Sequence, residues 1–423
     1  MKKYQTLRQK YPFFIYRNYQ IQKIKKGVVL KYQFELPPDF YFCSTVQINA
    51  TPKTPFLQKL DNLAFHLGLV EMLNYWKLCA SPVIQIEAGN LSREGKSFLR
   101  KIILKGMGEY FYKNQINFVQ KKFIQIKVNS KKPLMPALQI KSGTNKFLIP
   151  IGGGKDSAVI IEILKRKGNY LGAFVLNPTP IQLKMAQKGK IQEIIKVRRK
   201  LDPLLFELNK KGFLNGHVPF SAFLAFLSLI VAYLFNYQKI AFGWEKSANE
   251  PNLKYKGRWI NHQWSKTSEF EKLFQNYANK YLLKNVTIFS PIRGFNELEI
   301  AQVFAKLKQY HRIFVSCNNA FKLKQKKYSW CGRCPKCLFV FASLYPFLSE
   351  KELVRIFKKN LFQDKSLIPL MNQLIAPKYT KPFECVGTKK EAYQAFALSL
   401  QKALQSSKKL PPLLEYFQKH YFG

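Results

Sequence analysis

One stretch constrains the fold of this chain more than any other: residues 147–164, which read FLIPIGGGKDSAVIIEIL. The apolar run at its start has the length and the β-branched residues of a buried strand. Glycines then interrupt the run, and an apolar pattern typical of a buried helix follows. The turn and the start of the helix consist of Gly152, Gly153, Gly154, Lys155, Asp156 and Ser157.

A strand, a glycine-rich turn and a helix N-terminus together indicate a site for phosphate groups. Glycines let the backbone approach an anion, and the free N–H groups of the first helical turn point at it. Ser157 can add a hydroxyl donor and Lys155 a positive charge. The Walker pattern does not fit, because Asp156 separates the lysine from the serine. The segment resembles the SGGxDS loop of the PP-loop ATP pyrophosphatases, with Gly152 in place of the first serine; a turn without ligand is the alternative.

The residues that follow predict a parallel sheet. Gly168 ends the helix, and Tyr170 to Asn177 form a second apolar strand before Pro178. A strand–helix–strand order is typical of a doubly wound α/β fold, in which ligands bind at the carboxyl ends of the strands. Asn177 is therefore a further candidate for ATP binding. We expect residues 184–200 to form a basic helix that faces solvent.

The remaining segments predict the domain organisation. Short alternating runs near the N-terminus indicate β-hairpins, and helical and strand patterns alternate after them. We expect an N-terminal α+β domain over residues 1–135, a PP-loop nucleotide-binding domain over 140–345 and a helical extension over 346–423. The predicted class is α/β, with a parallel, doubly wound sheet like that of the adenine nucleotide α-hydrolases.

Composition restricts the class of protein. With 47% hydrophobic residues the chain is globular rather than disordered. The longest apolar segment, Phe220–Phe235, is shorter than the ~18 residues of a membrane helix and contains polar residues, so we expect a buried helix and no membrane span. The N-terminus lacks the apolar core of an export signal, which favours a cytoplasmic protein.

The formal net charge of +46 does not exclude nucleic acid as a binding partner. The lysines are spread along the whole chain without an arginine-rich block, a distribution that also follows from the compositional bias of a genome. Anionic small substrates benefit from such a charge equally.

Four of the seven cysteines are spaced as C-x13-C-x2-C-x2-C: Cys317, Cys331, Cys334 and Cys337. Without an export signal, we do not expect a disulfide framework. Thiolates at this spacing suit a structural zinc ion with all four positions filled. An iron–sulfur cluster takes the same ligands, and buried cysteines without metal are the third interpretation.

Polar segments rich in Asn, His, Glu and Lys lie at the ends of predicted elements, over residues 214–217, 244–250 and 261–266. Such loops are typical of binding edges, although ordinary caps and turns give similar patterns. A further segment, KPFECVGT over residues 381–388, lies between two predicted helices. Its Cys385 is either a thiol acid–base group or a small buried hydrophobe.

Taken in chain order, these segments resemble one family. They are FHLGLVEMLNYWK, IEAG, GMGEYFYKN, GGGKDS, LDPLLFELN, FLNGHVPFSA, SANE, NHQ-x-SK, SCN, WCGRCPKCLFVF and KPFECVGT. The chain is similar over nearly its whole length to the MurL family, the UDP-N-acetyl-α-D-muramoyl-L-alanyl-L-glutamate epimerases. The resemblance implies ATP-dependent inversion of the terminal L-Glu of UDP-MurNAc-L-Ala-L-Glu to D-Glu, with release of AMP and diphosphate.

The resemblance also implies roles for individual residues. The segment Gly152–Ser157 would bind the ATP phosphates, with Lys155 stabilising their charge and Asp156 orienting Mg²⁺ or the loop. Candidates for substrate binding or proton transfer are His217, Glu245, Glu250, His262, Lys266 and Cys385. The sequence does not rank them. The alternatives are a PP-loop enzyme that adenylates a tRNA base and a zinc-stapled nucleic-acid-binding protein without catalysis.

Overall fold

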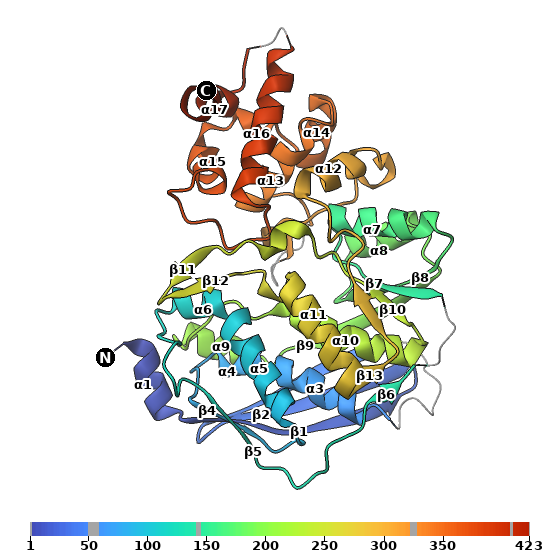
Figure 1. The fold of residues 1–423 in the computed structure, drawn as a ribbon, viewed down its shortest axis with the longest axis vertical. Coiled ribbons are helices and arrows are strands. Elements are labelled where there is room, and N and C mark those ends of the chain that lie inside the picture. The colour runs from blue at the N-terminus through green and yellow to red at the C-terminus, as the bar shows by residue number, and fades with distance from the viewer. Residues whose placement is uncertain (1, 50–58, 141–144, 322–327, 407–408, 423) are drawn as a thin grey trace.

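A computed structural model describes residues 2–49, 59–140, 145–321, 328–406 and 409–422. Its centre is a 10-stranded mixed sheet with the order β14-β10-β7-β8-β9-β3-β2-β1-β4-β5. In Figure 1 this sheet and its helices form the lower part of the molecule, and the C-terminal helices form the upper part. The α/β class is confirmed, but the sheet is mixed rather than wholly parallel.

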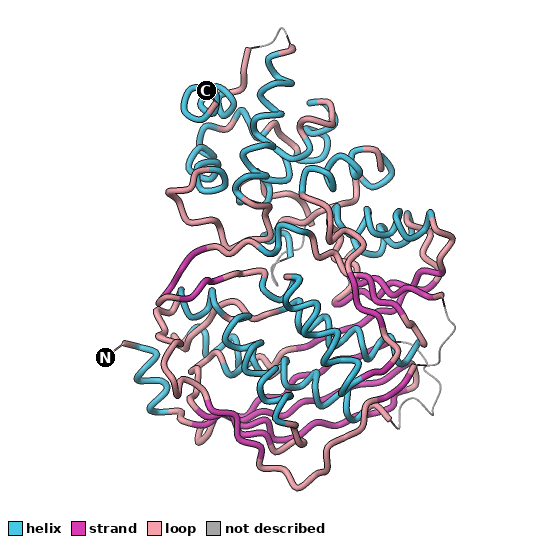
Figure 2. Tube along the Cα trace, viewed as in Figure 1, coloured by secondary structure: helices cyan, strands magenta, loops and turns pink. Residues whose placement is uncertain are grey.

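Figure 2 shows the strands in the lower part of the molecule and only helices and loops in its upper part. The strands are β1 (Phe13–Ile24), β2 (Gly27–Leu36), β3 (Phe40–Asn49), β4 (Val83–Ile86), β5 (Gln125–Val128), β6 (Leu138–Gln139), β7 (Lys146–Pro150), β8 (Tyr170–Leu176), β9 (Glu193–Lys200), β10 (Lys239–Ala241), β11 (Leu253–Tyr255), β12 (Arg258–Ile260), β13 (Leu283–Lys284) and β14 (Thr287–Phe289). The helices are α1 (Lys3–Lys10), α3 (Asp61–Glu71), α4 (Leu73–Trp76), α5 (Arg93–Gly106), α6 (Gly108–Lys113), α7 (Lys155–Arg166), α8 (Pro180–Lys188), α9 (Leu204–Lys210), α10 (Phe220–Phe235), α11 (Ser268–Tyr277), α12 (Glu297–Ala305), α13 (Pro335–Leu344), α14 (Glu350–Phe357), α15 (Ile368–Ile375), α16 (Lys389–Leu404) and α17 (Pro412–Tyr421).

The strands β14, β10, β7, β8 and β9 form a parallel half of the sheet. From β7 the chain adds β8 and β9 on one side, and it then returns to add β10 and β14 on the other side. The direction in which strands are added therefore reverses next to β7, and such a reversal opens a crevice at the carboxyl ends of the strands. The strand, glycine turn and helix predicted over residues 147–164 are confirmed as β7 and α7.

Both faces of this parallel half are covered. Leu148 and Phe174 point into a core that they share with α3 and α10. Their neighbours Ile149 and Ala173 point into a second core, formed with α7, α8 and the C-terminal helices. Successive side chains of a strand point to opposite faces, so burial on both sides explains why β7 is apolar after Lys146 and β8 is apolar over its whole length.

The N-terminal hairpins join the same sheet through β9, which pairs with β3 in antiparallel orientation. The basic helix predicted over residues 184–200 is therefore wrong in its second half. Exposed Lys196 and Arg198 alternate with buried Ile195 and Val197, which is the period of a half-buried strand. The sheet thus continues without a break from the parallel half into the N-terminal strands.

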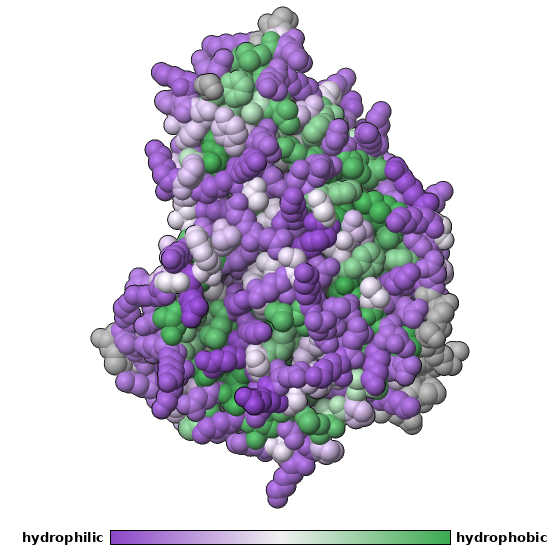
Figure 3. All heavy atoms as spheres, viewed as in Figure 1, coloured by the Kyte–Doolittle hydropathy of each residue, from purple (hydrophilic) through white to green (hydrophobic). Residues whose placement is uncertain are grey.

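The C-terminal helices α13, α15, α16 and α17 pack with α7 and α12 around the second core. Hydrophilic side chains dominate the face of the molecule shown in Figure 3, with smaller apolar patches between them. In the described residues, no helix has both the length and the hydropathy that a bilayer crossing requires.

Candidate active site

The glycine loop, residues Gly152–Ser157, lies at the carboxyl end of β7, where the direction of strand addition reverses. Gly153 has a φ of +88°, and its carbonyl oxygen accepts a hydrogen bond from the backbone N–H of Val315 at 3.0 Å. Gly154 is the N-cap residue of α7, and no side chain in the described chain caps this helix end. Gly152 is exposed, and a Cβ at its position would have no neighbour within 4 Å. The loop therefore leaves open space beside a helix N-terminus.

Lys155 is buried at the base of the glycine loop. Its Nζ atom donates to Asp156 Oδ1 at 2.6 Å and to Glu297 Oε2. Burial lowers the pKa of Lys155, but the two carboxylates raise it by more, so the lysine stays charged. The Oε1 atom of Glu297 is buried and has no hydrogen-bond partner among the described residues. Ser157 Oγ accepts a hydrogen bond from the backbone N–H of Gly152 at 3.2 Å.

Asn177 lies at the end of β8, the strand next to β7. It adopts a φ of +48°, and its backbone N–H donates to Val197 at 2.7 Å. Its side-chain Oδ1 accepts from the backbone N–H of Arg199 at 2.8 Å. Asn177 thus joins β8 to β9, and it lines a cavity of about 670 Å³ together with Arg198 and Lys200.

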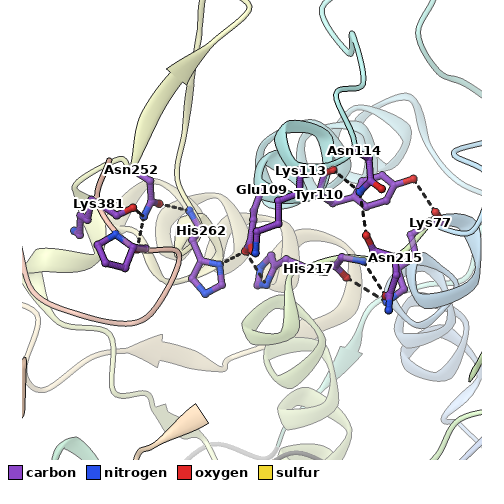
Figure 4. Close-up of polar contacts among 12 residues, drawn as sticks. Lys77, Glu109, Tyr110, Lys113, Asn114, Asn215, His217, Asn252, His262 and Lys381 are labelled. Atoms are coloured by element: carbon purple, nitrogen blue, oxygen red, sulfur yellow. Dashed lines mark hydrogen bonds and ion pairs between the residues drawn. The ribbon is translucent and has the colours of Figure 1, made fainter. Parts of the chain in front are cut away.

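A second group of titratable side chains, which we call the Cys385 cluster, consists of Glu109, His217, His262, Lys266 and Cys385. In Figure 4, His262 and His217 both point toward Glu109. The Nδ1 atom of His262 hydrogen-bonds to Glu109 Oε2, and the Nδ1 atom of His217 lies 3.9 Å from the same oxygen. The two imidazole rings are 4.2 Å apart. Lys266 Nζ lies 3.2 Å from Cys385 Sγ.

Asn252 and Glu250, which both follow the short helical turn after Glu245, hold the segment around Cys385 next to this cluster. Asn252 donates to the carbonyl oxygen of Pro382 at 2.8 Å, and its Oδ1 accepts from the backbone N–H of His262 at 2.8 Å (Figure 4). Glu250 forms an ion pair with Lys381 at 3.1 Å. Glu250, a candidate for proton transfer in the sequence, is therefore engaged in anchoring this segment.

The charges of the Cys385 cluster shift the pKa values of its members. Burial raises the pKa of the Cys385 thiol, but Lys266 and His262 lower it by more, to about 5. Burial lowers the pKa of His262, whereas its interactions with Cys385 and Glu109 raise it to about 9. Burial and the neighbouring His262 charge lower the pKa of His217 to about 3. At neutral pH the cluster therefore holds a thiolate beside an imidazolium and a neutral imidazole.

Glu245 is buried, and its Oε2 atom lacks a hydrogen-bond partner within the described residues. Burial raises the pKa of its carboxyl, the charge of Lys266 lowers it, and Glu297 and Asp156 raise it again, to about 7. Near neutral pH this carboxyl can therefore either give or take a proton.

Two lysines act on both parts of the site. Burial raises the pKa of Asp156 in the glycine loop, but Lys155, Lys336 and Lys266 lower it by more. Lys266 and Lys336 also lower the pKa of the Cys385 thiol. The glycine loop and the Cys385 cluster therefore lie within electrostatic reach of the same two cations.

The four cysteines predicted as metal ligands come together. Their Sγ atoms all lie within 4.8 Å of one another, with separations of 3.5 Å for Cys334–Cys337, 3.7 Å for Cys331–Cys337 and 3.9 Å for Cys317–Cys334. Thiolates placed ~2.3 Å from a tetrahedral zinc ion would be about 3.8 Å apart. The four thiols thus have the spacing of a tetrahedral metal site.

This four-cysteine cluster connects the two parts of the site. Val315, which holds Gly153, lies two residues before Cys317. On the other side, Lys336 lies between Cys334 and Cys337 at the start of α13, and its Nζ atom donates to the carbonyl oxygen of Cys385. Fixing the four cysteines therefore fixes both the glycine loop and the Cys385 segment.

Two family models and several known proteins match this chain. A family model described as the MurL N-terminal domain matches residues 5–291, and one described as the MurL C-terminal domain matches residues 313–418. A protein of Micromonospora sp. named UDP-N-acetyl-alpha-D-muramoyl-L-alanyl-L-glutamate epimerase is 34% identical over 332 residues, which cover 78% of this chain and 73% of that protein. Proteins of the same name from Salinispora tropica and Xanthomonas oryzae pv. oryzae are 33% and 31% identical, covering 84% and 88% of this chain and 77% and 82% of their own lengths.

Proposed function

Because the chain belongs to the MurL family, we propose that it inverts the terminal L-Glu of UDP-MurNAc-L-Ala-L-Glu to D-Glu during synthesis of peptidoglycan precursors, and that it cleaves ATP to AMP and diphosphate. The names of its relatives support the epimerisation and the substrate. One observation supports the ATP-dependent route above others: an open glycine loop at a helix N-terminus shares two lysines with a thiolate–imidazolium pair.

The chemistry explains why ATP is needed. A proton next to a free carboxylate is very weakly acidic, because the carbanion would form beside a negative charge. Transfer of AMP to that carboxylate gives a neutral mixed anhydride whose carbonyl oxygen can accept the charge. A base then removes the α-proton, an acid returns a proton to the opposite face, and water cleaves the anhydride. The products are the D-Glu peptide, AMP and diphosphate.

We assign the glycine loop to the ATP phosphates, in the manner of a PP-loop on a doubly wound sheet. The unpaired N–H groups of the first turn of α7, the Ser157 hydroxyl and the open space at Gly152 support this assignment. The single positive charge of Lys155 offsets only part of the negative charge of Asp156 and Glu297 beneath the loop. The unpartnered Oε1 of Glu297, together with Asp156, fits a Mg²⁺ ion, which neutralises phosphate charge when bound.

We assign proton transfer to Cys385 and Glu245, which both interact with Lys266. The Cys385 thiolate is the base, because its pKa of about 5 keeps it deprotonated at neutral pH. Glu245, with a pKa of about 7, is partly protonated there and can supply the second proton. Lys266 supplies positive charge for the oxygen on which negative charge develops.

We further propose that the four-cysteine cluster holds a structural zinc ion, since its sulfur separations match tetrahedral geometry. Elemental analysis of the purified protein should find about one zinc ion per chain, because four thiolates fill one tetrahedral site. Iron with sulfide, or a metal-free protein with full activity, would contradict the proposal.

The product assay tests the function directly. The protein is incubated with ATP, Mg²⁺ and UDP-MurNAc-L-Ala-L-Glu, the nucleotides are separated, and the configuration of the glutamate is determined after acid hydrolysis. We expect AMP and D-Glu to appear together, and neither to form when ATP or the peptide is omitted. Formation of ADP, or of AMP without D-Glu, would contradict the proposal.

A PP-loop enzyme that adenylates a tRNA base remains the second candidate, favoured by the net charge and by the basic cavity beside Asn177. It predicts AMP formation with bulk tRNA in the same assay and RNA binding that weakens steeply with salt. The epimerase proposal predicts no stimulation of AMP formation by tRNA.

A further inference from the structure

We propose that Glu109 is a positioning residue for the thiol: it holds His262, and His262 in turn holds Cys385 ready for reaction. Glu109 belongs to the segment GMGEYFYKN, to which the sequence assigned no catalytic role, and none of the family names assigns it one. The part of this inference that concerns α-proton removal rests on the proposed function, whereas the part that concerns the state of the thiol does not.

The contacts form a line from carboxylate to imidazole to thiol. Glu109 is buried on α6, and its Oε2 atom accepts the hydrogen bond from His262 Nδ1. The imidazole of His262 also interacts with the Cys385 side chain, whose Sγ atom lies 3.2 Å from Lys266 Nζ. Activated nucleophiles and acid–base groups have the same arrangement: a base lies beside the reactive group, and a third group orients the base.

The charges of these groups also indicate that His262 depends on Glu109 and that Cys385 depends on His262. Burial raises the pKa of Glu109, but His262 and Lys113 bring it down to about 2, so the carboxylate is charged throughout the neutral range. Without that negative charge, the imidazolium of His262 is less stable and loses its proton more easily. The thiolate of Cys385 then loses part of the positive charge that stabilises it. The other charged or titratable groups that face this line are Lys77, Lys113, His217, Glu245, Lys266, Lys336 and Glu384.

A divalent cation is the alternative occupant of this place, because ligand atoms of Glu109, His217 and His262 lie within 4.8 Å of one another. Two observations favour the proton relay. The second oxygen of Glu109 is bound to Lys113, and the cations Lys77 and Lys266 act on the histidine and the cysteine of the same cluster. A further positive ion would meet repulsion from all of them.

In the reaction, the thiolate sulfur of Cys385 forms a bond to the α-proton of the adenylated glutamate. The electron pair of the broken C–H bond moves into the carbonyl of the anhydride, and the thiol that results is neutral. His262 keeps its proton and remains hydrogen-bonded to Glu109. In the reverse direction the thiol returns the proton to the same face.

The state of the thiol is measured by the rate of alkylation of Cys385 with iodoacetamide across pH 4–9, followed by peptide mass spectrometry, in the wild type, Glu109→Gln and Glu94→Gln. We expect half-maximal reactivity of wild-type Cys385 near pH 5. In Glu109→Gln the midpoint should rise by one unit or more, which lowers the rate at pH 4, below both midpoints, about 10-fold. Glu94→Gln is the matched control, because Glu94 forms an exposed ion pair with Lys280. The exposed Cys43 serves as an internal standard.

A Glu109→Gln protein that folds and shows the wild-type profile at Cys385 would overturn the inference. If Glu109→Gln does not fold, His262→Gln answers the same question and should raise the midpoint by at least as much; an unchanged profile there overturns the inference too. A transition metal bound in addition to that of the four-cysteine cluster, and lost in Glu109→Gln, would replace the relay by a metal site.

The catalytic part is tested with the substrate in D₂O. At pH 4.5, below both midpoints, deuterium at the glutamate α-carbon in Glu109→Gln should fall about 10-fold relative to AMP formed, and Glu109→Asp should recover part of the loss. If the wild type forms no AMP, the proposed function fails while the alkylation result still stands. If the ratio of deuterium to AMP does not change, the role of Glu109 in proton removal is wrong.

Discussion

The glycine loop takes all its residues from one strand–turn–helix unit, whereas the Cys385 cluster takes its side chains from distant segments around residues 109, 217, 262–266 and 385. The loop is positioned by the local geometry of β7 and α7 and by one contact from Val315. The Cys385 cluster depends on tertiary contacts through Asn252, Glu250 and Lys336. The two regions therefore respond differently to mutation, and we propose that they perform different steps of one reaction.

The largest expected effect separates the two steps. Cys385→Ala removes the proposed base, so deuterium incorporation at the glutamate α-carbon should fall ~10²–10⁴-fold, the range for loss of a general base. AMP formation should fall much less, because the glycine loop is unchanged and water can still cleave the adenylate. AMP is measured by chromatography and deuterium by mass spectrometry in one sample. Retention of wild-type deuterium incorporation would remove Cys385 from the mechanism.

A change in the glycine loop should instead reduce both products together. Ser157→Ala removes a hydroxyl proposed to contact phosphate, and hydrogen bonds to charged groups contribute ~1.5–3 kcal/mol, so AMP formation should fall ~10–100-fold. Deuterium incorporation should fall in parallel, because proton removal requires the adenylate.

Lys155→Ala is the companion variant for this test. It should also reduce AMP formation, but it leaves Glu297 buried without its partner and should lower the free energy of unfolding by ~3–5 kcal/mol. Chemical denaturation measures that loss. Near-normal AMP release from both variants would contradict the assignment of the loop.

The pH dependence of epimerisation tests the Cys385 cluster without mutation. Below pH 5 the Cys385 thiol is protonated and cannot act as base, so kcat/KM should rise as pH increases through about 5. Above pH 7 the carboxyl of Glu245 is ionised and cannot donate, so kcat/KM should fall as pH increases through about 7. A rate that does not change between pH 4.5 and 8.5 would contradict both assignments.

The smallest expected effect concerns the first glycine. Gly152→Ser places a side chain in open space and introduces the residue that begins the SGGxDS pattern, so stability should change by less than ~0.5 kcal/mol. A hydroxyl that reaches phosphate contributes ~0.5–1.5 kcal/mol, which would lower KM for ATP ~2–10-fold.

Gly153→Ser is the matched control in the same loop. Gly153 has a φ of +88°, and a Cβ there would lie 3.0 Å from Ile181, so this variant should lose both stability and AMP formation. Equal effects of the two serine substitutions on thermal unfolding would show that the open space at Gly152 has no role.

The same contrast explains what could be predicted from the sequence. The β7–loop–α7 unit, strand β8 and helix α10 were predictable because their patterns are local and uninterrupted. Strand β9 was missed because its lysines and arginines suggested a solvated helix, although Ile195 and Val197 alternate with charged residues. The mixed sheet depends on the pairing of β9 with β3, which no local pattern encodes.

The site shows the same limit. Six candidates for substrate binding or proton transfer were named from their residue types, but Glu109 and Glu297 were not, because each lies in the first turn of a helix, where acids are common. Cys385 was open to interpretation as a small hydrophobe; only the tertiary approach of Lys266, Lys336 and His262 makes it a thiolate. Charge and proton affinity are properties of neighbours, and the neighbours here are distant in sequence.

The most direct measurement of the central claim is the dependence of α-proton exchange on ATP. The protein is incubated in D₂O with Mg²⁺ and UDP-MurNAc-L-Ala-L-Glu, with and without ATP, and deuterium at the glutamate α-carbon is compared with AMP. If the glycine loop activates the carboxylate for the Cys385 cluster, deuterium appears only with ATP, and each inverted glutamate is accompanied by AMP. Exchange at the same rate without ATP, or AMP without any exchange, would contradict the account.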